Sequence, residues 1–557
     1  MTTRSNSLHV RWCGQVPYRE MLAIQQAMFE FGEEQHLLLC EHPHVFTHGP
    51  HAELAKNLRC VPHEVGAELI EVQRGGDVTY HGPGQLVGYP ILDLPPKHGD
   101  FGPADTRAYI HSLEQLVIDV LVEFGLTDVG RRGEFPGVWV RPNSHDPRKI
   151  AAIGVRVGRG SSERRTMHGF ALNVTTDLDY MRTHIVPCGI SAFGVTSMAE
   201  EGVSVTMSDV VAAVGRLAIK RFGQGQGTNA GVVFAHRDDD LSAFSRGQGP
   251  GLPVRMVRRM DEAGVSEGLS ITVRKPDWIR PTVTLSPEVL ATKKTLRELD
   301  LVTVCEEAGC PNLSECWADS TATFMVLGDR CTRACGFCLV DTRKPLAPDA
   351  EEPARVAEAV SRMGLDFAVL TMVARDDLAD GGMDHVARCV RAIRDRRVGV
   401  QVETLVSDVK GTDALDVLLA ERPDVFNHNI ETVARLQRVV RPSAGYARSL
   451  SVLARARTSG LVTKSGLIVG MGETLDEVKE ALIDLAAVGV QIVTIGQYLR
   501  PTSHHLPVAR WVEPREFDEL ARFGESLGIQ HVQASPLTRS SYHAKTAHRH
   551  ASGAVHA

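Results

Sequence analysis

Six of the chain's eleven cysteines lie in one stretch of sequence, residues 305–338. They form two groups of three, which are Cys305, Cys310 and Cys316 with the spacing C-x4-C-x5-C, and Cys331, Cys335 and Cys338 with the spacing C-x3-C-x2-C. Thiolates bind metals, and structural zinc sites usually need four protein ligands. Each group is one ligand short, so each raises the question of what completes its site.

The second group, residues 331–338, has a spacing that suits an iron–sulfur cluster. Three thiolates can bind three irons of a [4Fe–4S] cluster, which leaves the fourth iron open for a substrate or cofactor. We therefore predict a cluster site here, with a zinc knuckle or buried thiols as the alternatives.

The first group, residues 305–316, also fits an iron–sulfur cluster. Pro311 and the polar residues after it favour a loop. The fourth ligand must then be a hydroxyl, a His or a carboxylate from elsewhere in the chain. One structural zinc site with a distant His is the alternative.

The N-terminal half offers a second kind of chemistry, nucleophilic catalysis. Cys188 lies between a proline and a glycine, which indicates a fixed, exposed turn. A nucleophilic Cys needs a base or a positive charge that lowers its pKa. Lys149, at the start of an apolar strand, is the first candidate, because partial desolvation lets a lysine relay protons near neutral pH. His81 and His168 are other candidate bases, and a structural thiol and a solvated lysine are the alternatives.

The elements that must position these residues follow from hydrophobic periodicity. In the C-terminal part, β-rich runs alternate with helical patterns, which predicts an α/β fold with a parallel sheet, open or curled into a partial barrel. The runs are residues 321–328, 366–373, 398–405, 425–430, 463–470 and 491–499. The second cysteine group then follows the C-terminal end of the first strand, where such folds carry their chemistry.

The N-terminal part has a mixed pattern, which predicts an α+β fold. Its helical stretches are residues 17–31 and 105–124, and its short strands are residues 36–40, 138–140, 151–157 and 169–174. Between the two parts, the Gly-rich and polar residues 223–273 are predicted to be a flexible linker. The small and polar residues 543–557 are predicted to be a disordered tail.

Length and composition indicate an ordinary globular chain of two to four domains, with 557 residues, 43% hydrophobic and 23% charged. The formal net charge of -7 gives no sign of a nucleic-acid partner. No run is apolar enough for a signal peptide or a membrane span. We therefore expect a cytoplasmic protein without a membrane partner, whose thiols stay reduced.

Residues 331–338 resemble the cysteine signature of the radical S-adenosylmethionine (SAM) superfamily. The resemblance implies that SAM binds the open iron through its amino and carboxylate groups and that one electron cleaves it to a 5′-deoxyadenosyl radical. Gly381 and Gly382, after the second strand, are then expected to let the backbone approach SAM. A plain turn is the alternative for these two glycines.

The two cysteine groups together resemble lipoyl synthase over residues 274–547. The motifs that carry the resemblance are "KPDWIRP", "TLRELDLVTVCEEAGCPNLSECW", "TFMVLGDRCTRACGFC", "NHNIETV", "GLIVGMGET", "GQYLRPTSHHLP" and "RSSYHA". The resemblance implies an auxiliary [4Fe–4S] cluster, held by the first cysteine group and by Ser541. This cluster donates sulfur to C6 and C8 of an octanoyl chain on a carrier-protein lysine. The rival interpretations are a biotin-synthase-like enzyme or radical methylthiotransferase, and a scaffold that binds lipoyl domains without catalysis.

Residues 7–222 resemble the octanoyltransferase that moves an octanoyl group from acyl carrier protein to lipoyl domains. The motifs are "RGGDVTYHGPGQLVGYPI", "GVWV", "KIAAIGVR", "HGFALNV" and "PCGI". The resemblance implies the α+β fold of biotin and lipoate ligases, a thioester on Cys188, and a Lys149 that lowers the thiol pKa and relays protons. The substrate-binding residues that it implies are Arg74, Gly75, Gly76, Asp77, Val78, Thr79, Tyr80, His81, Ala152, Ile153, Gly154, Gly169, Phe170 and Ala171.

The whole chain thus resembles a fusion of two consecutive enzymes of lipoate synthesis. An octanoyltransferase domain is expected at residues 1–222, and a radical SAM lipoyl synthase domain with a partial (β/α)6 barrel at residues 274–557. The implied cofactors are two [4Fe–4S] clusters and SAM. The implied partners are octanoyl-acyl carrier protein, the lipoyl domains of 2-oxoacid dehydrogenase complexes, the glycine cleavage H protein, and an electron donor such as ferredoxin or flavodoxin.

Overall fold

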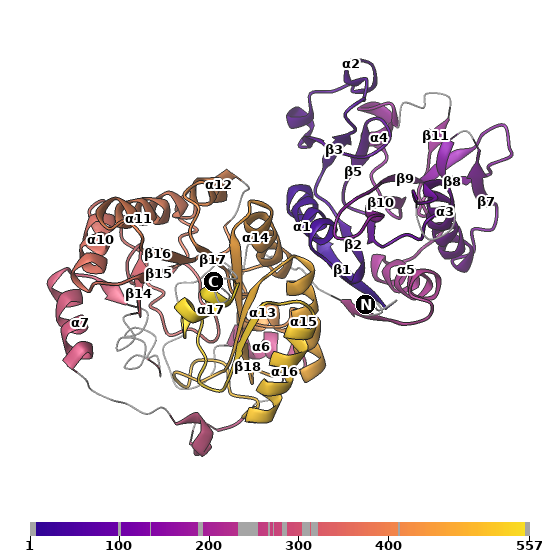
Figure 1. The fold of residues 1–557 in the computed structure, drawn as a ribbon. Helices are drawn as coiled ribbons and strands as arrows, with labels where there is room; N and C mark the ends of the chain where they lie inside the picture. The colour runs from indigo at the N-terminus through magenta and orange to yellow at the C-terminus, as the bar shows by residue number, and fades with distance from the viewer. Residues whose placement is uncertain are drawn as a thin grey trace. The chain divides into compact units, whose positions relative to one another are not determined.

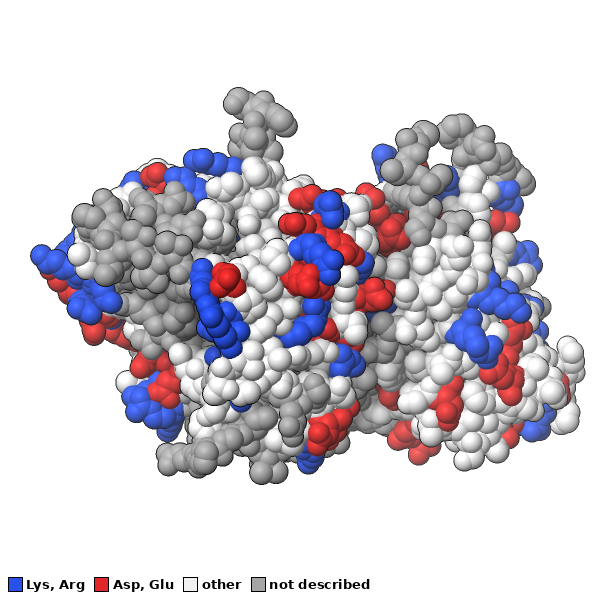
Figure 2. Space-filling view, turned by 90° about the horizontal axis from the view of Figure 1, so that it is seen from below, with Lys and Arg blue, Asp and Glu red and all other residues white. Residues whose placement is uncertain are grey.

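The chain folds into two compact units, Met1–Phe234 and Ala235–Ala557 (Figure 1). The computed structural model describes residues 7–97, 102–133, 135–187, 193–231, 254–265, 268–270, 272–280, 287–303, 312, 321–409 and 413–551. In these ranges, none of the helices has the length and apolar character needed to cross a membrane. Figure 2 shows basic and acidic side chains interleaved over the visible surface.

The first unit is built on a nine-stranded mixed sheet with the order β12-β1-β2-β6-β10-β9-β8-β7, and β11 pairs with β9. Its strands are β1 (Leu8–Gln15), β2 (Gln35–Glu41), β6 (Gln85–Ile91), β7 (Val129–Arg132), β8 (Phe135–Val140), β9 (Arg148–Gly158), β10 (Arg165–Asn173), β11 (Gly194–Val195) and β12 (Gly227–Gly231). A small separate sheet has the order β4-β3-β5. It consists of β3 (Val45–His48), β4 (Glu68–Glu71) and β5 (Thr79–His81).

The described part of the first unit also contains five α-helices. They are α1 (Tyr18–Glu30), α2 (Leu54–Asn57), α3 (Thr106–Glu123), α4 (Asp179–Thr183) and α5 (Met207–Phe222). Apolar residues of α3 and α5 share one core with residues of the strands, whereas α1 packs on β6 and β10. The Asp105 carboxylate accepts a hydrogen bond from Ala108 N–H at the start of α3, and Thr206 with Asp209 forms a capping box at the start of α5. The predicted α+β fold is confirmed.

The second unit contains an eight-stranded sheet with the order β13-β14-β15-β16-β17-β18-β19-β20. The strands are β13 (Val302–Thr303), β14 (Thr321–Val326), β15 (Phe367–Met372), β16 (Gln401–Leu405), β17 (Val425–Asn427), β18 (Val462–Val469), β19 (Ile492–Gln497) and β20 (His531–Ala534). Neighbours from β14 to β20 pair in parallel, and only β13 is antiparallel. The six predicted strands are all present, and the parallel sheet fits the predicted partial barrel.

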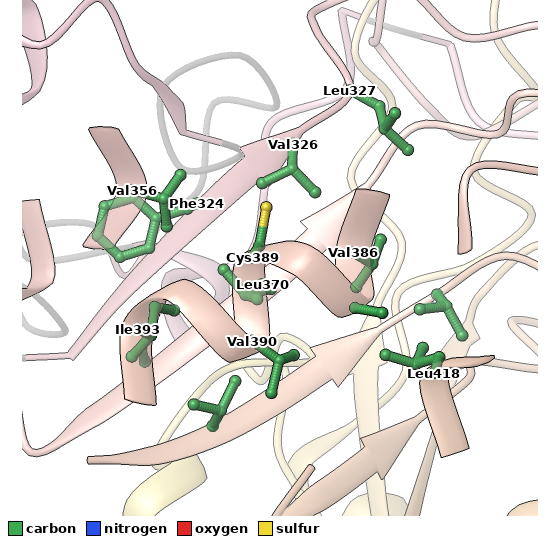
Figure 3. Packing of buried hydrophobic residues seen from close by; sticks show 14 of the residues in the cluster. Phe324, Val326, Leu327, Val356, Leu370, Val386, Cys389, Val390, Ile393 and Leu418 are labelled. Carbon is green, nitrogen blue, oxygen red and sulfur yellow. The ribbon is translucent and has the colours of Figure 1, made fainter. Parts of the chain in front are cut away.

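The helices of the second unit are α6 (Val254–Glu262), α7 (Pro287–Glu298), α10 (Glu352–Arg362), α11 (Met383–Arg396), α12 (Asp413–Ala420), α13 (Gln437–Val440), α14 (Tyr446–Thr458), α15 (Leu475–Ala487), α16 (Pro514–Ser526) and α17 (Ala544–Ala551). Several connect successive parallel strands, as expected for βα units. Figure 3 shows how α10, α11 and α12 bury apolar side chains against β14 and β15, including Phe324, Leu370 and Val390.

Helix α17 packs on the opposite side of the sheet from α10 and α11. Side chains alternate along a strand, and on β15 Leu370 joins the core formed with these outer helices, whereas Phe367 joins Ala544 of α17. The strand residues that share apolar clusters with α17 include the first residues of β15, β17, β18 and β19, namely Phe367, Val425, Val462 and Ile492. Helix α17 therefore covers the N-terminal end of the sheet on its inner face.

Two stretches form regular structure where the sequence predicts none. The predicted disordered tail is wrong for residues 544–551, because the small side chains of Ala544, Ala547 and Ala551 fit against strand residues. The predicted linker is wrong at both ends, because β12 pairs with β1 and α6 packs on α13. Met260 of α6 is buried, and Glu262 pairs with Arg438 at 2.9 Å.

Candidate active sites

The second cysteine group lies in a loop at the C-terminal end of β14. Leu327 and Gly328 have positive φ angles of 69° and 88°, which turn the chain away from the strand. The loop returns at Asp341, whose carbonyl accepts a hydrogen bond of 2.8 Å from Cys331 N–H. Gly336 N–H donates to Val440 O at 2.8 Å, and Leu506 N–H donates to Gly336 O at 2.9 Å. Segments from distant parts of the chain thus fix the cysteine loop.

The thiols of Cys331, Cys335 and Cys338 are half-buried and share one environment. Loss of water and the neighbouring thiols of Cys338 and Cys331 raise the pKa of Cys335 to about 12. Arg333 N–H donates to Cys331 Sγ at 3.4 Å, a type of contact that stabilises a thiolate on a metal. Within the described ranges, no three His, Cys, Asp or Glu side chains are placed to share a single ion. The three thiols are the soft ligands that an iron–sulfur cluster takes, and each thiol of such a cluster binds a different iron.

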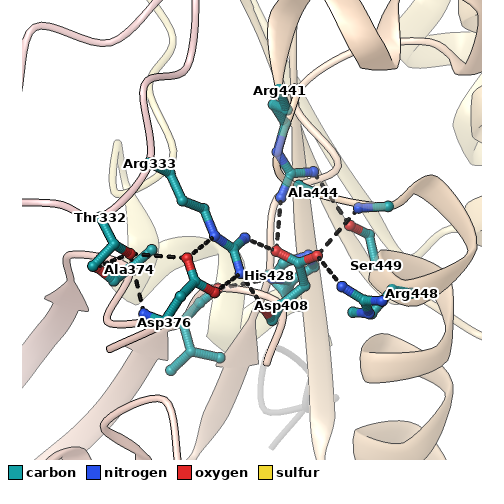
Figure 4. A network of polar contacts seen from close by, with 12 residues as sticks. Thr332, Arg333, Ala374, Asp376, Asp408, His428, Arg441, Ala444, Arg448 and Ser449 are labelled. Atoms are coloured by element: carbon teal, nitrogen blue, oxygen red, sulfur yellow. Dashed lines mark hydrogen bonds and ion pairs between the residues drawn. The ribbon is translucent and has the colours of Figure 1, made fainter. Parts of the chain in front are cut away.

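Arg333, between the first two cysteines of the loop, anchors it to the neighbouring strands (Figure 4). Its guanidinium donates to both carboxylate oxygens of Asp376 at 2.8 Å, and also to the carboxylate of Asp408 and, at 2.8 Å, to the Asp408 carbonyl. Asp376 follows β15 and Asp408 follows β16. Burial alone would raise the pKa of Asp408, but Arg333 and Arg441 hold it well below its usual range.

Replacing Arg333 by methionine is expected to destabilise the second unit by about 3 kcal/mol, because Asp408 is fully buried and loses its closest positive partner. The measurement is the urea midpoint of unfolding, with iron content after anaerobic reconstitution as a second readout. Arg391→Met is the matched control, because Arg391 pairs with Glu421 but its side chain is half exposed. This variant should lower the free energy of unfolding by less than about 1 kcal/mol. Equal losses of unfolding free energy in both variants would contradict a special role for Arg333.

Gly381 and Gly382 form the turn that starts α11. Their φ angles are 61° and 89°, a region that side chains rarely adopt. A Cβ on Gly381 would lie 2.7 Å from Val409 Cγ1, and one on Gly382 would lie 2.4 Å from Leu327 Cδ1. The positive φ angles and the close packing explain why glycine stands at both positions. A contact of either glycine with SAM stays a prediction.

The first cysteine group, Cys305, Cys310 and Cys316, lies outside the described residues. Asn312, between its second and third members, is described and buried. Its Nδ2 donates to Leu537 O at 2.7 Å, so Asn312 lies beside the chain just before Arg539-Ser540-Ser541-Tyr542.

The two serines of that motif differ in their contacts. Ser540 Oγ accepts from Asn427 Nδ2 at 3.0 Å and donates to Asn429 Oδ1 at 3.2 Å. Ser541 is half-buried, and its carbonyl accepts from Ala544 N–H, but its hydroxyl makes no hydrogen bond to any residue that the structure describes. The described contacts therefore engage the Ser540 hydroxyl but not the Ser541 hydroxyl.

In the first unit, Lys149 is buried as the second residue of β9. Its Nζ lies 5.4 Å from the centre of the Trp139 ring, which gives the ammonium a cation–π contact. Gly137 has a φ of 128°, and a Cβ there would lie 2.5 Å from Lys149 Cε. The sequence pattern predicts the strand position of the lysine, but neither Trp139 nor the close approach of Gly137.

Cys188 lies outside the described residues, but the chain on its C-terminal side reaches Lys149. Val195 of β11 pairs with Lys149 in parallel, and Thr196 N–H donates to Lys149 O at 3.0 Å. Phe193 packs edge-on against Trp139 with ring centres 5.7 Å apart. Residues 193–196, which follow Cys188 in the sequence, are thus joined directly to the strand that carries the lysine and to its neighbour β8.

The three predicted substrate-binding segments meet in space. Gly169–Ala171 of β10 lie opposite Ala152–Gly154 of β9, and Gly169 pairs with Gly154. A Cβ on Gly154 would lie 3.2 Å from Arg74 Cδ, so the Arg74–His81 segment packs over this pair. Arg74 is held there by hydrogen bonds to Thr47 O and Asp77 O at 2.8 and 3.0 Å.

The two other candidate bases of the first unit are poorly suited to that role. Burial, together with nearby positive charge, lowers the pKa of His81 and of His168 to about 3, so both rings stay neutral at physiological pH. His81 Nδ1 bonds Gln85 Oε1 at 2.7 Å. His168 is buried with a φ of 61°, and its ring nitrogens have no hydrogen-bond partner among the described residues.

The first unit is expected to lose stability as the pH falls below about 6.5. Burial lowers the pKa of His42 to about 4 and that of His81 and His168 to about 3, while the unfolded chain protonates near 6.5. The unfolded state then binds more protons, which lowers the free energy of unfolding by roughly 1.4 kcal/mol per histidine and pH unit in this window. Thermal unfolding at pH 7, 6 and 5 measures the slope. His42→Gln should reduce the slope by about one histidine's share, roughly 1.4 kcal/mol per pH unit, and a variant of the exposed His145 should leave it unchanged.

Two family profiles match separate parts of the chain. One is described as the lipoyl protein ligase A/B catalytic domain and matches residues 17–217. The other is described as the radical SAM superfamily and matches residues 325–485. The first range contains Lys149 and all the predicted substrate-binding residues, and the second contains the cysteine loop after β14.

Curated relatives match the second unit over nearly their whole length. Lipoyl synthase from Methylococcus capsulatus is 51% identical over 310 residues, which are 55% of this chain and 96% of that protein. Lipoyl synthase from Mycobacterium avium is 52% identical over 282 residues, which are 50% of this chain and 92% of that protein. Among solved structures, a bi-partite lipoate protein ligase from Thermoplasma acidophilum covers 41% of this chain and 88% of its own, with 18% identity and a TM-score of 0.33.

Proposed function

The chain belongs to the lipoyl synthase family through its second unit, and from this premise we propose that it is a bifunctional enzyme of lipoate biosynthesis. The first unit, a lipoate ligase-like acyltransferase, moves an octanoyl group from acyl carrier protein to a lysine of a lipoyl domain. The second unit then inserts sulfur at C6 and C8 of that octanoyl group. Both steps act on the same acceptor arm.

In the proposed first step, the Cys188 thiolate attacks the thioester carbonyl of octanoyl-acyl carrier protein. The carrier's thiolate leaves and takes up a proton, and the octanoyl group stays on Cys188 as a new thioester. The acceptor lysine amine then attacks this thioester, an amide forms, and the Cys188 thiolate leaves. Lys149 is the residue that takes and returns the proton. It is supported in this role by its burial against Trp139 and by its pairing with β11.

In the proposed second step, the side chains of Cys331, Cys335 and Cys338 hold a [4Fe–4S] cluster. When bound there with SAM, this cluster supplies a radical that removes hydrogen from unactivated carbon. Arg333 keeps the cysteine loop fixed to β15 and β16 through Asp376 and Asp408.

The contact between Asn312 and Leu537 carries the proposal of an auxiliary site. Asn312 stands between Cys310 and Cys316 in the sequence, and its contact near the C-terminal motif supports a cluster held by Cys305, Cys310 and Cys316 that takes Ser541 as its fourth ligand. Ser541 is the better candidate ligand than Ser540. The Ser541 hydroxyl makes no hydrogen bond to any described residue, whereas the Ser540 hydroxyl bonds Asn427 and Asn429. The chain would then hold two [4Fe–4S] clusters.

The proposed partners follow from the two steps. Octanoyl-acyl carrier protein is the donor, and the acceptors are lipoyl domains of 2-oxoacid dehydrogenase complexes and the glycine cleavage H protein. Cleavage of SAM needs one electron, for which ferredoxin or flavodoxin is the proposed source.

Mass spectrometry of a lipoyl domain tests the proposed function. After incubation with octanoyl-acyl carrier protein, SAM and a reductant, the domain should gain first an octanoyl group and then two sulfur atoms. Iron quantitation after anaerobic reconstitution should give about eight irons per chain. About four irons would indicate a single-cluster enzyme such as the biotin-synthase-like rival, and unmodified lipoyl domain would favour a scaffold.

A further inference from the structure

The segment that follows β19, residues 498–508, packs against the cysteine loop at 331–338. Leu506 is buried, and its N–H donates to Gly336 O at 2.9 Å. A Cβ on Gly336 would lie 2.8 Å from Leu506 Cδ1, so a larger residue there would push against the leucine. The Tyr498 hydroxyl donates to Leu506 O at 2.8 Å and ties the segment to the end of β19. Residues 498–508 thus support the cysteine loop in addition to Arg333.

Within this segment, His505 bonds the third cysteine directly. Its Nε2 lies 2.9 Å from Cys338 O, and its side chain is buried. A carbonyl oxygen can only accept, so Nε2 carries the proton and donates it. Cys338 N–H donates to Cys335 O at 3.2 Å, so the backbone of the third cysteine is held on both sides of its Cα. The next residue, Leu339, is 39% exposed, so the His505 bond lies where the cysteine loop reaches the surface.

The orientation of the His505 ring is set by its own segment. In a neutral imidazole with the proton on Nε2, the other nitrogen, Nδ1, is an acceptor. The Thr502 hydroxyl lies 2.8 Å from Nδ1 and donates to it, and the same hydroxyl accepts from His504 N–H at 3.2 Å. Arg500 Nε donates to Thr502 O at 3.1 Å and to His505 O at 3.0 Å. The donor of His505 is therefore held in place toward the Cys338 carbonyl.

Arg333 and His505 hold different parts of the cysteine loop. Arg333 stands between Cys331 and Cys335 in the sequence, and its side chain ties that part of the loop to residues after β15 and β16 (Figure 4). His505 holds the other end of the loop, at Cys338. The three thiolates of a [4Fe–4S] cluster bind three different irons, so all three must be placed correctly at the same time.

We propose that His505 is a positioning residue for the cluster at 331–338, which places the Cys338 thiol through its hydrogen bond to the Cys338 carbonyl. This inference rests on the proposed function, in which Cys331, Cys335 and Cys338 hold a [4Fe–4S] cluster. Groups that orient a metal ligand without binding the metal change metal affinity by about 10–100-fold when they are removed. Loss of the His505 donor should therefore speed the release of iron from this cluster.

The experiment compares the wild-type chain with His505 variants after anaerobic reconstitution. Aliquots taken during incubation with an iron chelator are reduced, and their electron paramagnetic resonance spectra are recorded with and without SAM. Only a cluster with an open iron binds SAM, so the signal that SAM changes reports the cluster at 331–338. In His505→Phe this signal should disappear at least about tenfold faster than in the wild type. His505→Gln, whose amide can donate from near the position of Nε2, should restore the half-life to within about threefold.

Tyr498→Phe is the matched control for these variants. It also removes a buried hydrogen bond of 2.8 Å from a side chain to a carbonyl in the same segment, but that carbonyl belongs to Leu506 and not to a cysteine. Its half-life should stay near that of the wild type.

Three results would overturn the inference: an unchanged half-life in His505→Phe, a loss in His505→Gln as large as in His505→Phe, or an equal loss in Tyr498→Phe. If His505→Phe does not fold, His505→Asn takes its place, because the shorter amide leaves Cys338 O without this donor, and an unchanged half-life there overturns the inference. A wild-type chain without any signal that SAM changes would instead overturn the proposed function.

Discussion

A chain with Cys188 replaced by serine should transfer octanoate at least ~1000-fold more slowly, because a neutral hydroxyl is a far weaker nucleophile than a thiolate. The same variant should still insert sulfur into a lipoyl domain that already carries octanoate, since the cysteine loop at 331–338 belongs to the other unit. Mass spectrometry of the lipoyl domain, given the two substrates in separate reactions, measures both activities.

Cys60→Ser is the matched control for this experiment. Cys60 lies in the same unit with a half-buried thiol, and burial raises its pKa, which makes it a poor nucleophile. This variant should transfer octanoate at the wild-type rate. Transfer by Cys188→Ser above about a tenth of the wild-type rate would contradict covalent catalysis by Cys188.

A chain with Ser541 replaced by cysteine is expected to keep both clusters but to insert sulfur at least ~10-fold more slowly. Thiolate is a softer ligand than a serine oxygen and binds iron more firmly, so the auxiliary cluster should release its iron less readily. Ser541→Ala should instead lose the auxiliary cluster and about half of the iron. The measurements are iron per chain and the lipoyl product formed in a single turnover.

Measuring SAM cleavage distinguishes an effect on the cysteine loop at 331–338 from an effect on the proposed auxiliary site. In the proposed mechanism SAM cleavage depends on Cys331, Cys335 and Cys338, so it should continue in both Ser541 variants. Ser535→Cys is the control and should behave as the wild type. Undiminished sulfur insertion by Ser541→Cys would refute the idea that the serine serves as a readily released ligand.

Periodicity located some of the regular elements of both units. Helices α1 and α3 and the six predicted parallel strands lie within a few residues of their predicted positions. Strand β20 was missed because it has only four residues, His531–Ala534, and no clear alternation. Helix α17 was missed because its residues look polar, although Ala544, Ala547 and Ala551 mark one face at helical spacing.

The candidate sites were predictable where residues close in sequence act together. The spacing of Cys331, Cys335 and Cys338 indicates a cluster without any structure. The role of Arg333 does not follow from spacing, because its partners Asp376 and Asp408 come from other strands. Likewise, only the pairing of β9 with β10 brings the predicted substrate-binding segments together, since register is a property of the folded sheet.

The position of α17 sets an order of events during synthesis. The helix covers the first residues of β15, β17, β18 and β19, yet it is translated after all of them. At roughly 5–20 residues per second, the roughly 200 residues between Cys338 and Ser541 take the ribosome about 10–40 seconds. During that time the cysteine loop at 331–338 already has all three of its thiols, whereas the inner face of the sheet still lacks α17 and the proposed auxiliary site still lacks Ser541. Of the two proposed cluster sites, the one at 331–338 therefore has its protein ligands complete first, and the proposed auxiliary site has them complete only near the end of translation.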